Sequence, residues 1–144
     1  VCLKLGLNEA DATDGGKPRL LDVGCGWGSM AMHAAARYGA EVVAVTISDE
    51  QAALARRRVA DSGLSDLVEI RVQDYREVID GPFDAISSIG MAEHVGKKNM
   101  VRYFEQLHGL LRPGGRVLNH AIGSIGGVED ERPPLHPPLR VPRR

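Results

Sequence analysis

The stretch LLDVGCGWG, residues 20–28, decides the fold of this chain. It begins as an apolar strand and ends in three glycines that alternate with Cys25 and Trp27. Glycine has no Cβ, so a ligand can approach the backbone of such a loop closely. The helix expected from Ser29 would point its amide groups and the positive end of its dipole at the same crevice. The stretch therefore predicts a ligand site at the carboxyl end of a first strand.

Strand-like and helix-like segments alternate on either side of this loop. Strands are expected at 19–23, 41–47, 67–72, 83–89 and 116–122, and helices at 29–38, 48–62 and 97–111. Ser48 with Gln51 three residues later predicts a capping box at the start of the second helix. The third helix is expected to bury the apolar residues that recur every three or four positions, Met100, Phe104, Leu107 and Leu111. This alternation predicts an α/β fold with a doubly wound, mostly parallel sheet.

The composition fits one ordinary soluble domain. The chain has 144 residues, of which 43% are hydrophobic and 26% charged, and a net charge of −1 gives no reason to expect a nucleic-acid partner. No apolar run approaches the roughly 20 residues that span a bilayer, and no signal peptide is visible. Cys2 and Cys25 suggest neither a disulfide framework nor a metal cluster, so we expect no metal and a cytoplasmic location.

The last part of the chain differs from the rest. Residues 132–144 hold five of the eight prolines and show no helical or strand periodicity. We therefore expect residues 126–144 to be a disordered Pro/Arg-rich tail. Residues 1–125 are interpreted as a partial, C-terminally truncated core whose fifth strand would be an exposed edge.

The glycine spacing distinguishes between cofactors. NAD, FAD and S-adenosylmethionine all suit a glycine loop after a first strand. Here the glycines alternate at 24, 26 and 28, and Asp22 precedes the first by two positions, which resembles the first motif of methyltransferases. This spacing favours S-adenosylmethionine over a dinucleotide. Most such enzymes hold the ribose with an acidic residue at the end of the second strand, but here Thr46 stands there and no carboxylate follows before Asp49.

Five strings between residues 20 and 123 resemble the cyclopropane-fatty-acid synthase family, which includes the mycolic-acid cyclopropane synthases. The strings are LLDVGCGWGS, AVTISDEQ, VQDY, SSIGMAEHVG and VLNHAIG. The resemblance implies a Rossmann-like class I methyltransferase fold and an S-adenosyl-L-methionine-dependent enzyme of lipid biosynthesis. It implies transfer of a methylene or methyl group to a cis double bond of an unsaturated fatty-acyl lipid, as in cyclopropane-fatty-acyl-phospholipid synthases.

The resemblance also assigns roles to single residues. The implied cofactor-binding residues are Gly24, Cys25 and Gly26 in the loop, Thr46 and Gln51 beside the ribose, and Asp74 and Tyr75 beside the adenine. The implied catalytic residues are Glu93, His120 and Ile122, around a bicarbonate ion that would take the proton lost in ring closure. A backbone contact near Ile122 would complete the cradle for that ion. An apolar pocket there would raise the pKa of Glu93.

Other interpretations stay open. Glu93 could simply begin a helix, and His120 could be a structural histidine in an apolar strand. Arg56 to Arg58 favour a solvated helix face, although a basic patch could touch anionic membrane lipid. Methyl transfer without ring closure, N-methylation of a small amine and a non-catalytic fragment are the alternative functions. The family's upstream Tyr-Ser-Cys segment and its substrate lid are not found in this sequence, so we expect weak cofactor binding by this chain alone.

Overall fold

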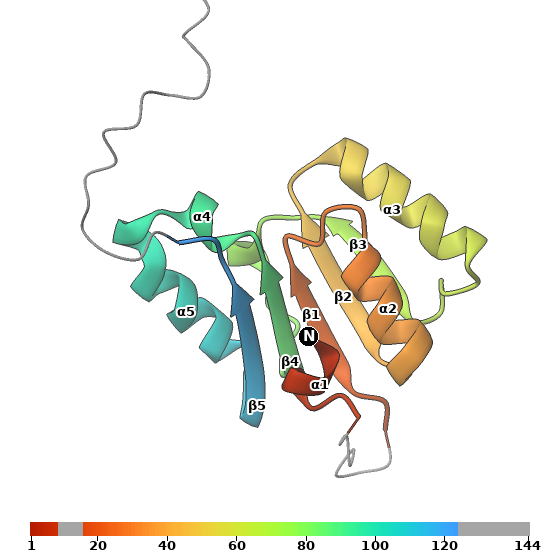
Figure 1. The fold of residues 1–144 in the computed structure, drawn as a ribbon, viewed down its shortest axis with the longest axis horizontal. Coiled ribbons are helices and arrows are strands. Elements are labelled where there is room, and N and C mark those ends of the chain that lie inside the picture. Colours follow the sequence, from red (N-terminus) through yellow and green to blue (C-terminus); the bar gives the residue numbers. More distant parts are fainter. Residues whose placement is uncertain (9–15, 124–144) are drawn as a thin grey trace, which may run out of the picture.

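A computed structural model describes residues 1–8 and 16–123, which form a parallel sheet with helices on both faces (Figure 1). The strands are β1 (Arg19–Val23), β2 (Glu41–Thr46), β3 (Val68–Val72), β4 (Phe83–Ile89) and β5 (Leu111–His120). Their order is β3-β2-β1-β4-β5, and every neighbouring pair is parallel. The chain reverses its direction of winding next to β1, so the switch point lies at the carboxyl ends of β1 and β4. The predicted doubly wound fold is confirmed, whereas the predicted tail, residues 126–144, lies outside the described residues.

Two buried clusters flank the sheet, because successive side chains of a strand point to opposite faces. On one face, Leu20 packs with α1 (Cys2–Leu5), α2 (Ser29–Tyr38) and α3 (Asp49–Asp61). On the other, Leu21 and Val23 pack with α4 (Ala92–Val95) and α5 (Met100–Gly109). Two 3₁₀ turns, η1 (Tyr75–Glu77) and η2 (Lys97–Asn99), complete the described elements. Burial on both faces explains why the strands are nearly continuous apolar runs.

Most predicted boundaries hold to within a residue or two, but the region after β4 differs. The helix expected at 97–111 is split into η2 and α5, and β5 begins at Leu111 instead of at 116. A register shift within the β4–β5 pair, in which Phe83 pairs with Leu111 and Ala85 with Arg116, absorbs the Pro-Gly-Gly segment that was expected to stay outside the strand. The four-residue helix α1 was not predicted.

The buried face of α5 was predicted only in part, because Leu107 is buried as expected but Phe104 is not. Tyr103 and Leu107 are fully buried, whereas Phe104 is 39% exposed. Tyr103 therefore takes the place in the buried stripe that was expected for Phe104. Spacings of three and four fit both stripes equally well, and the sheet selects the one in which the Tyr103 hydroxyl has a partner.

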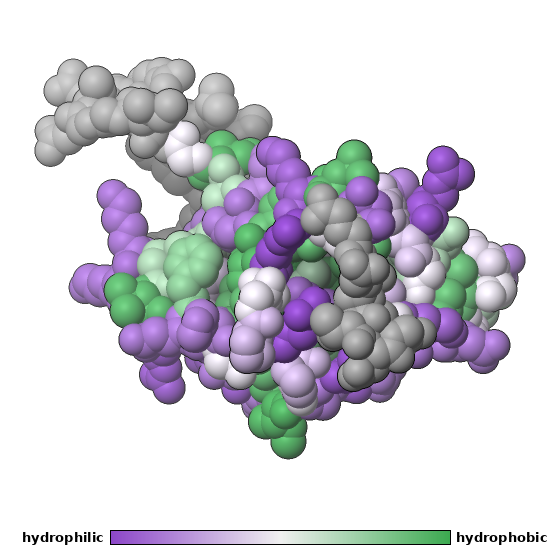
Figure 2. All heavy atoms as spheres, turned by 90° about the horizontal axis from the view of Figure 1, so that it is seen from below, coloured by the Kyte–Doolittle hydropathy of each residue, from purple (hydrophilic) through white to green (hydrophobic). Residues whose placement is uncertain are grey.

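The two ends of the sheet differ in character. Seen from below Figure 1, the amino ends of the strands lie on a largely hydrophilic face with small, separate apolar groups (Figure 2). At the carboxyl ends, large exposed apolar side chains follow or end the strands, among them Trp27, Ile47, Ile89 and Ile122. Among the described residues, β5 is an edge strand, as expected. None of the helices in the described part of the chain is both long and apolar enough to cross a membrane.

Candidate functional site

A cleft of about 610 Å³ opens at the carboxyl ends of the central strands. Its size falls within the range of small-molecule and cofactor sites. It is lined by six of the seven predicted cofactor residues, Gly24, Gly26, Thr46, Gln51, Asp74 and Tyr75. The seventh, Cys25, is buried beside the cleft and is not part of its lining. Residues from three separate loops thus meet at the switch point of the sheet.

The glycine loop is tied to the neighbouring strand. The backbone N–H groups of Gly24 and Cys25 both donate to the carbonyl of Val45, each at 3.0 Å. Gly28 begins α2 with a φ of 81°, and a Cβ at this position would lie 3.1 Å from the Cβ of Ala55 on α3. Only glycine combines that backbone conformation with such close helix packing. Burial raises the pKa of the Cys25 thiol to about 12, so this side chain is a protonated packing group and not a nucleophile.

A short hydrogen-bonded chain forms the wall at the end of β2. Thr46 Oγ1 donates to Gln51 Oε1 at 2.8 Å and accepts the N–H of Ser48 at 3.2 Å. Ser48 Oγ accepts the N–H of Gln51 at 3.3 Å, which confirms Ser48 as the N-cap of α3. In a complete capping box, the Gln51 side chain would also accept the backbone N–H of Ser48. It does not, because its amide oxygen accepts from Thr46 instead. With that oxygen engaged, Gln51 offers its NH₂ group to a ligand hydroxyl.

The opposite wall follows β3. Asp74 caps η1 by accepting the N–H of Arg76 at 2.9 Å, and both of its oxygens also accept from the Arg76 guanidinium. These hydrogen bonds lower the pKa of Asp74, so it is a carboxylate. The ring of Tyr75 stands edge-on to that of Tyr103, with 5.0 Å between centroids. The wall therefore presents an acceptor beside an aromatic ring.

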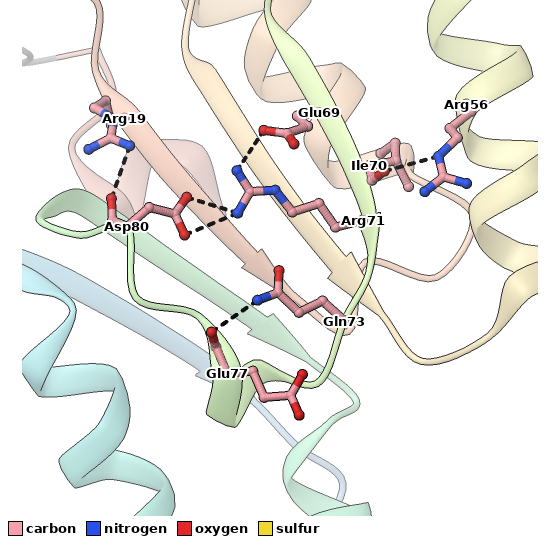
Figure 3. A network of polar contacts seen from close by, with 8 residues as sticks. All are labelled: Arg19, Arg56, Glu69, Ile70, Arg71, Gln73, Glu77 and Asp80. Atoms are coloured by element: carbon pink, nitrogen blue, oxygen red, sulfur yellow. Dashed lines mark hydrogen bonds and ion pairs between the residues drawn. The ribbon is translucent and has the colours of Figure 1, made fainter.

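The connection from β3 to β4 is fastened to the sheet by a polar network (Figure 3). The Arg71 guanidinium on β3 donates to both carboxylate oxygens of Asp80, at 3.0 and 2.9 Å. Arg19 on β1 donates to the carbonyl of Asp80 at 3.2 Å, and Gln73 Nε2 donates to the carbonyl of Glu77 at 3.0 Å. The turn that carries the aromatic wall is thus held from both ends.

The three predicted catalytic residues gather at the ends of β4 and β5, beyond the cleft lining. The N–H of Gly90 donates to the carbonyl of His120 at 2.8 Å, which places α4 next to the end of β5. Glu93 Oε1 then accepts the N–H of Ile122 at 2.6 Å. This contact joins residues 29 positions apart in the chain.

The environment of Glu93 contradicts one expectation. An apolar pocket was expected to raise the pKa of Glu93, but the side chain is exposed in the described structure. The hydrogen bond from the N–H of Ile122 lowers that pKa instead. Electrostatic interactions with His94 and His120 lower the pKa of Glu93 further. In this structure the backbone at Ile122, where a contact to bicarbonate was expected, donates its N–H to Glu93.

Sequence reasoning missed part of the cleft lining. The lining residues that it did not assign include Met91, His94, Asn99 and Arg102, which come from the segment after β4. Met91 lies directly over the glycine loop, since a Cβ on Gly24 would be 3.4 Å from its sulfur atom. Met91 could have been predicted as a cleft residue from its position, because it comes just after a strand that ends at the switch point.

Known proteins share both the sequence and the fold of this chain. The family model described as mycolic acid cyclopropane synthetase matches residues 3–132. The chain is 54% identical over 104 residues to a probable fatty acid methyltransferase of Mycobacterium tuberculosis, covering 72% of this chain and 24% of that protein. It is 49% identical over 106 residues to the cyclopropane-fatty-acyl-phospholipid synthase of Escherichia coli K12, covering 74% and 26%. The chain therefore spans about a quarter of the length of these curated relatives.

A solved structure extends the likeness to three dimensions. The crystal structure of the mycolic acid cyclopropane synthase CmaA1, complexed with SAH and CTAB, superposes with a TM-score of 0.61 at 35% sequence identity. The match covers 74% of this chain and 38% of that one. This likeness confirms the predicted class I methyltransferase fold.

Proposed function

Because this chain belongs to the mycolic acid cyclopropane synthetase family, we propose that it forms the cofactor-binding part of an S-adenosylmethionine-dependent enzyme that modifies fatty-acyl lipids. The reaction we propose is transfer of a methylene group to a cis double bond of an unsaturated acyl chain. The observation that carries this proposal is the cleft, which gathers the glycine loop, the Thr46–Gln51 pair and the Asp74–Tyr75 wall in one place.

The residues of the cleft fit S-adenosylmethionine in size and in chemistry. Gly24 and Gly26 leave room for the methionine end of the cofactor to approach the backbone. The amide NH₂ of Gln51 would donate to a ribose hydroxyl. The carboxylate of Asp74 would accept from the adenine amino group, and the ring of Tyr75 would contact the adenine face. When bound, the cofactor supplies a methyl group on a positively charged sulfur.

We assign the chemistry on the acyl chain to the corner formed by Glu93, His120 and Ile122. Glu93 is a charged carboxylate whose orientation is set by the N–H of Ile122. A fixed negative charge at this point would stabilise the positive charge that develops on an alkene as it accepts a methyl group. A bicarbonate ion held at this corner would accept the proton that is lost in ring closure, and the N–H of Ile122, which donates to Glu93 Oε1 in this structure, would be free for that ion once Glu93 turned away.

Methyl transfer without ring closure is the second candidate. It is favoured by the relative named as a probable fatty acid methyltransferase, which is 54% identical to this chain. Both reactions need the same cofactor cleft and the same alkene, and both begin with methylation of the alkene to a carbocation. Loss of a proton from the new methyl group to a base would close the ring, whereas loss of a proton from a neighbouring chain carbon would leave a methyl-branched alkene. We place either reaction in the cytoplasm. We also propose that it takes place at a lipid surface, since Ile47 and Ile122 expose apolar side chains at the cleft end of the sheet.

Two measurements test the proposal. Calorimetric titration of the 144-residue chain with S-adenosylhomocysteine should show saturable binding that Gln51→Ala weakens. Mass spectrometry of lipids from cells that express the complete gene should show acyl chains that have gained one CH₂ at the olefin. Upfield cyclopropyl proton signals would identify ring closure, and their absence would identify methyl branching. Failure to bind S-adenosylhomocysteine together with unchanged lipids would contradict the proposal.

A further inference from the structure

Tyr103 on α5 links the end of β4 to the aromatic wall of the cleft. Its side chain is completely buried, and its hydroxyl oxygen lies 2.5 Å from Oγ of Ser88, which is also completely buried. Its ring meets the ring of Tyr75 edge-on, with an interplanar angle of 81°. A buried hydroxyl is costly without a partner, so the bond to Ser88 determines where the Tyr103 ring sits. The Tyr103 ring in turn forms one side of the space that holds Tyr75.

The neighbouring serine acts on the other face of the same strand. Ser87 Oγ donates to Asp22 Oδ1 at 2.7 Å, just before the glycine loop. Successive strand residues point to opposite faces, so Ser87 and Ser88 connect the end of β4 to the two walls of the cleft separately. Ser87 contacts the strand that leads into the glycine loop, and Ser88 contacts the ring that supports Tyr75.

We propose that Tyr103 is a positioning residue for cofactor recognition, holding the half-buried ring of Tyr75 in the orientation that contacts the adenine. This inference rests on the proposed function, because it takes the ligand of the cleft to be S-adenosylmethionine. A phenylalanine would fill the core equally well, whereas the tyrosine hydroxyl adds a directional bond to the strand end. Edge-to-face geometry is the preferred arrangement of such a ring pair and restricts the rotamers of Tyr75.

The test compares Tyr103→Leu, which removes the ring, with Tyr103→Phe and Ser88→Ala, which remove only the hydroxyl bond. Tyr38→Leu is the matched control, because Tyr38 pairs with His33 on α2, away from the cleft. Ring NMR signals of the three tyrosines report positioning without ligand. Calorimetry with S-adenosylhomocysteine then reports recognition, in the native protein and in a Tyr75→Ala background.

Tyr103→Leu should shift the Tyr75 ring signals and leave those of Tyr38 in place. It should weaken S-adenosylhomocysteine binding roughly three- to tenfold in the native background, and not at all when Tyr75 is already alanine. Tyr103→Phe and Ser88→Ala should show a smaller loss of the same kind, and they keep the test valid if the leucine variant does not fold. Unchanged Tyr75 signals, or equal losses in both backgrounds, would overturn the proposal.

The ligand-free measurement separates this inference from the proposed function. If the native chain bound no S-adenosylhomocysteine while Tyr103→Leu still moved the Tyr75 signals, the proposed cofactor would be wrong and the ring contact would stand. If the native chain bound the ligand and Tyr103→Leu changed neither the signals nor the affinity, the proposed function would stand and the role of Tyr103 would fall.

Discussion

The hydroxyl of Thr46, the last residue of β2, donates to the side-chain oxygen of Gln51 in the first turn of α3 across 2.8 Å. This bond crosses the turn between β2 and α3, which carries no carboxylate before Asp49. It orients the neutral amide of Gln51 at the wall of the cleft. The site thereby gains donors for a hydroxyl group without adding a negative charge.

Thr46→Val should weaken S-adenosylhomocysteine binding about fivefold, because the loss of one hydrogen bond worth roughly 1 kcal/mol frees the Gln51 side chain. The N–H of Ser48 loses its acceptor as well, so the free energy of unfolding should fall by about 1 kcal/mol. Calorimetry and urea denaturation measure the two effects. Thr46→Ser is the control and should behave nearly as the native chain. A valine variant with native affinity would refute the role of this pair.

Gly26→Ala should mainly reduce cofactor affinity and Gly28→Ala should mainly reduce stability, although both add one methyl group at a positive φ. Gly26 lines the cleft and nothing lies within 4 Å of its added Cβ, so the methyl group should obstruct the cofactor and reduce affinity at least tenfold. Gly28 packs against Ala55, so its methyl group should cost roughly 2 kcal/mol of unfolding free energy. Titration and denaturation of both variants provide the comparison. The interpretation fails if the alanine at 26 binds normally.

Asp80→Asn should loosen the connection that carries the aromatic wall. Both partners of the Arg71–Asp80 ion pair are partly exposed, so we expect the free energy of unfolding to fall by only about 1 kcal/mol. S-adenosylhomocysteine affinity should fall about two- to fourfold, because the turn bearing Tyr75 becomes more mobile. Both effects should shrink in high salt. Asp66→Asn changes an exposed carboxylate just before β3 and serves as the control; equal behaviour of the two variants would argue against the network.

Asp22 should make the chain less stable as pH rises through the acid range. Burial raises its pKa to about 6, and among the described residues Oδ2 has no hydrogen-bond partner. The unfolded chain therefore releases this proton first, so unfolding becomes easier between about pH 4 and pH 6 by roughly 2–3 kcal/mol and then levels off. Asp22→Asn should remove this component.

Urea denaturation at several pH values from 4 to 7 tests that prediction. The difference in unfolding free energy between the native chain and Asp22→Asn should change with pH over this window. A pH-independent difference for Asp22→Asn would show that the carboxyl is not buried as described.

Glu93→Gln and His120→Ala should separate binding from catalysis. Neither residue lines the cleft, so S-adenosylhomocysteine affinity should stay within about twofold of the native value. In the complete enzyme, turnover on unsaturated lipid should fall at least about a hundredfold for Glu93→Gln, because a fixed charge near the reacting alkene is lost. His120→Ala should reduce turnover less, about tenfold or more. Full activity of both variants would reject this catalytic corner.

Much of the cofactor half of the site was predictable because its signals are local. The glycine loop after an apolar strand and the Ser48 cap are each recognised within a few residues, whereas the roles of Thr46, Gln51, Asp74 and Tyr75 were implied by the family resemblance. Parallel strands then bring these loops to one edge of the sheet without further information. Six of the predicted cofactor residues line one cleft for this reason.

By itself, the sequence determined the doubly wound fold class, the ligand site at the carboxyl ends of the strands and the family resemblance, because strand periodicity and motif spacing are properties of neighbouring residues. Only the tertiary structure decided that Gln51 turns to Thr46, that Tyr103 and not Phe104 is buried, and that Glu93 is an exposed, low-pKa carboxylate. Each of these three features depends on which hydrogen-bond donor, aromatic ring or strand end the fold places next to the side chain. The partner of Tyr103 is 15 residues away and that of Glu93 is 29 residues away, beyond the reach of any local pattern.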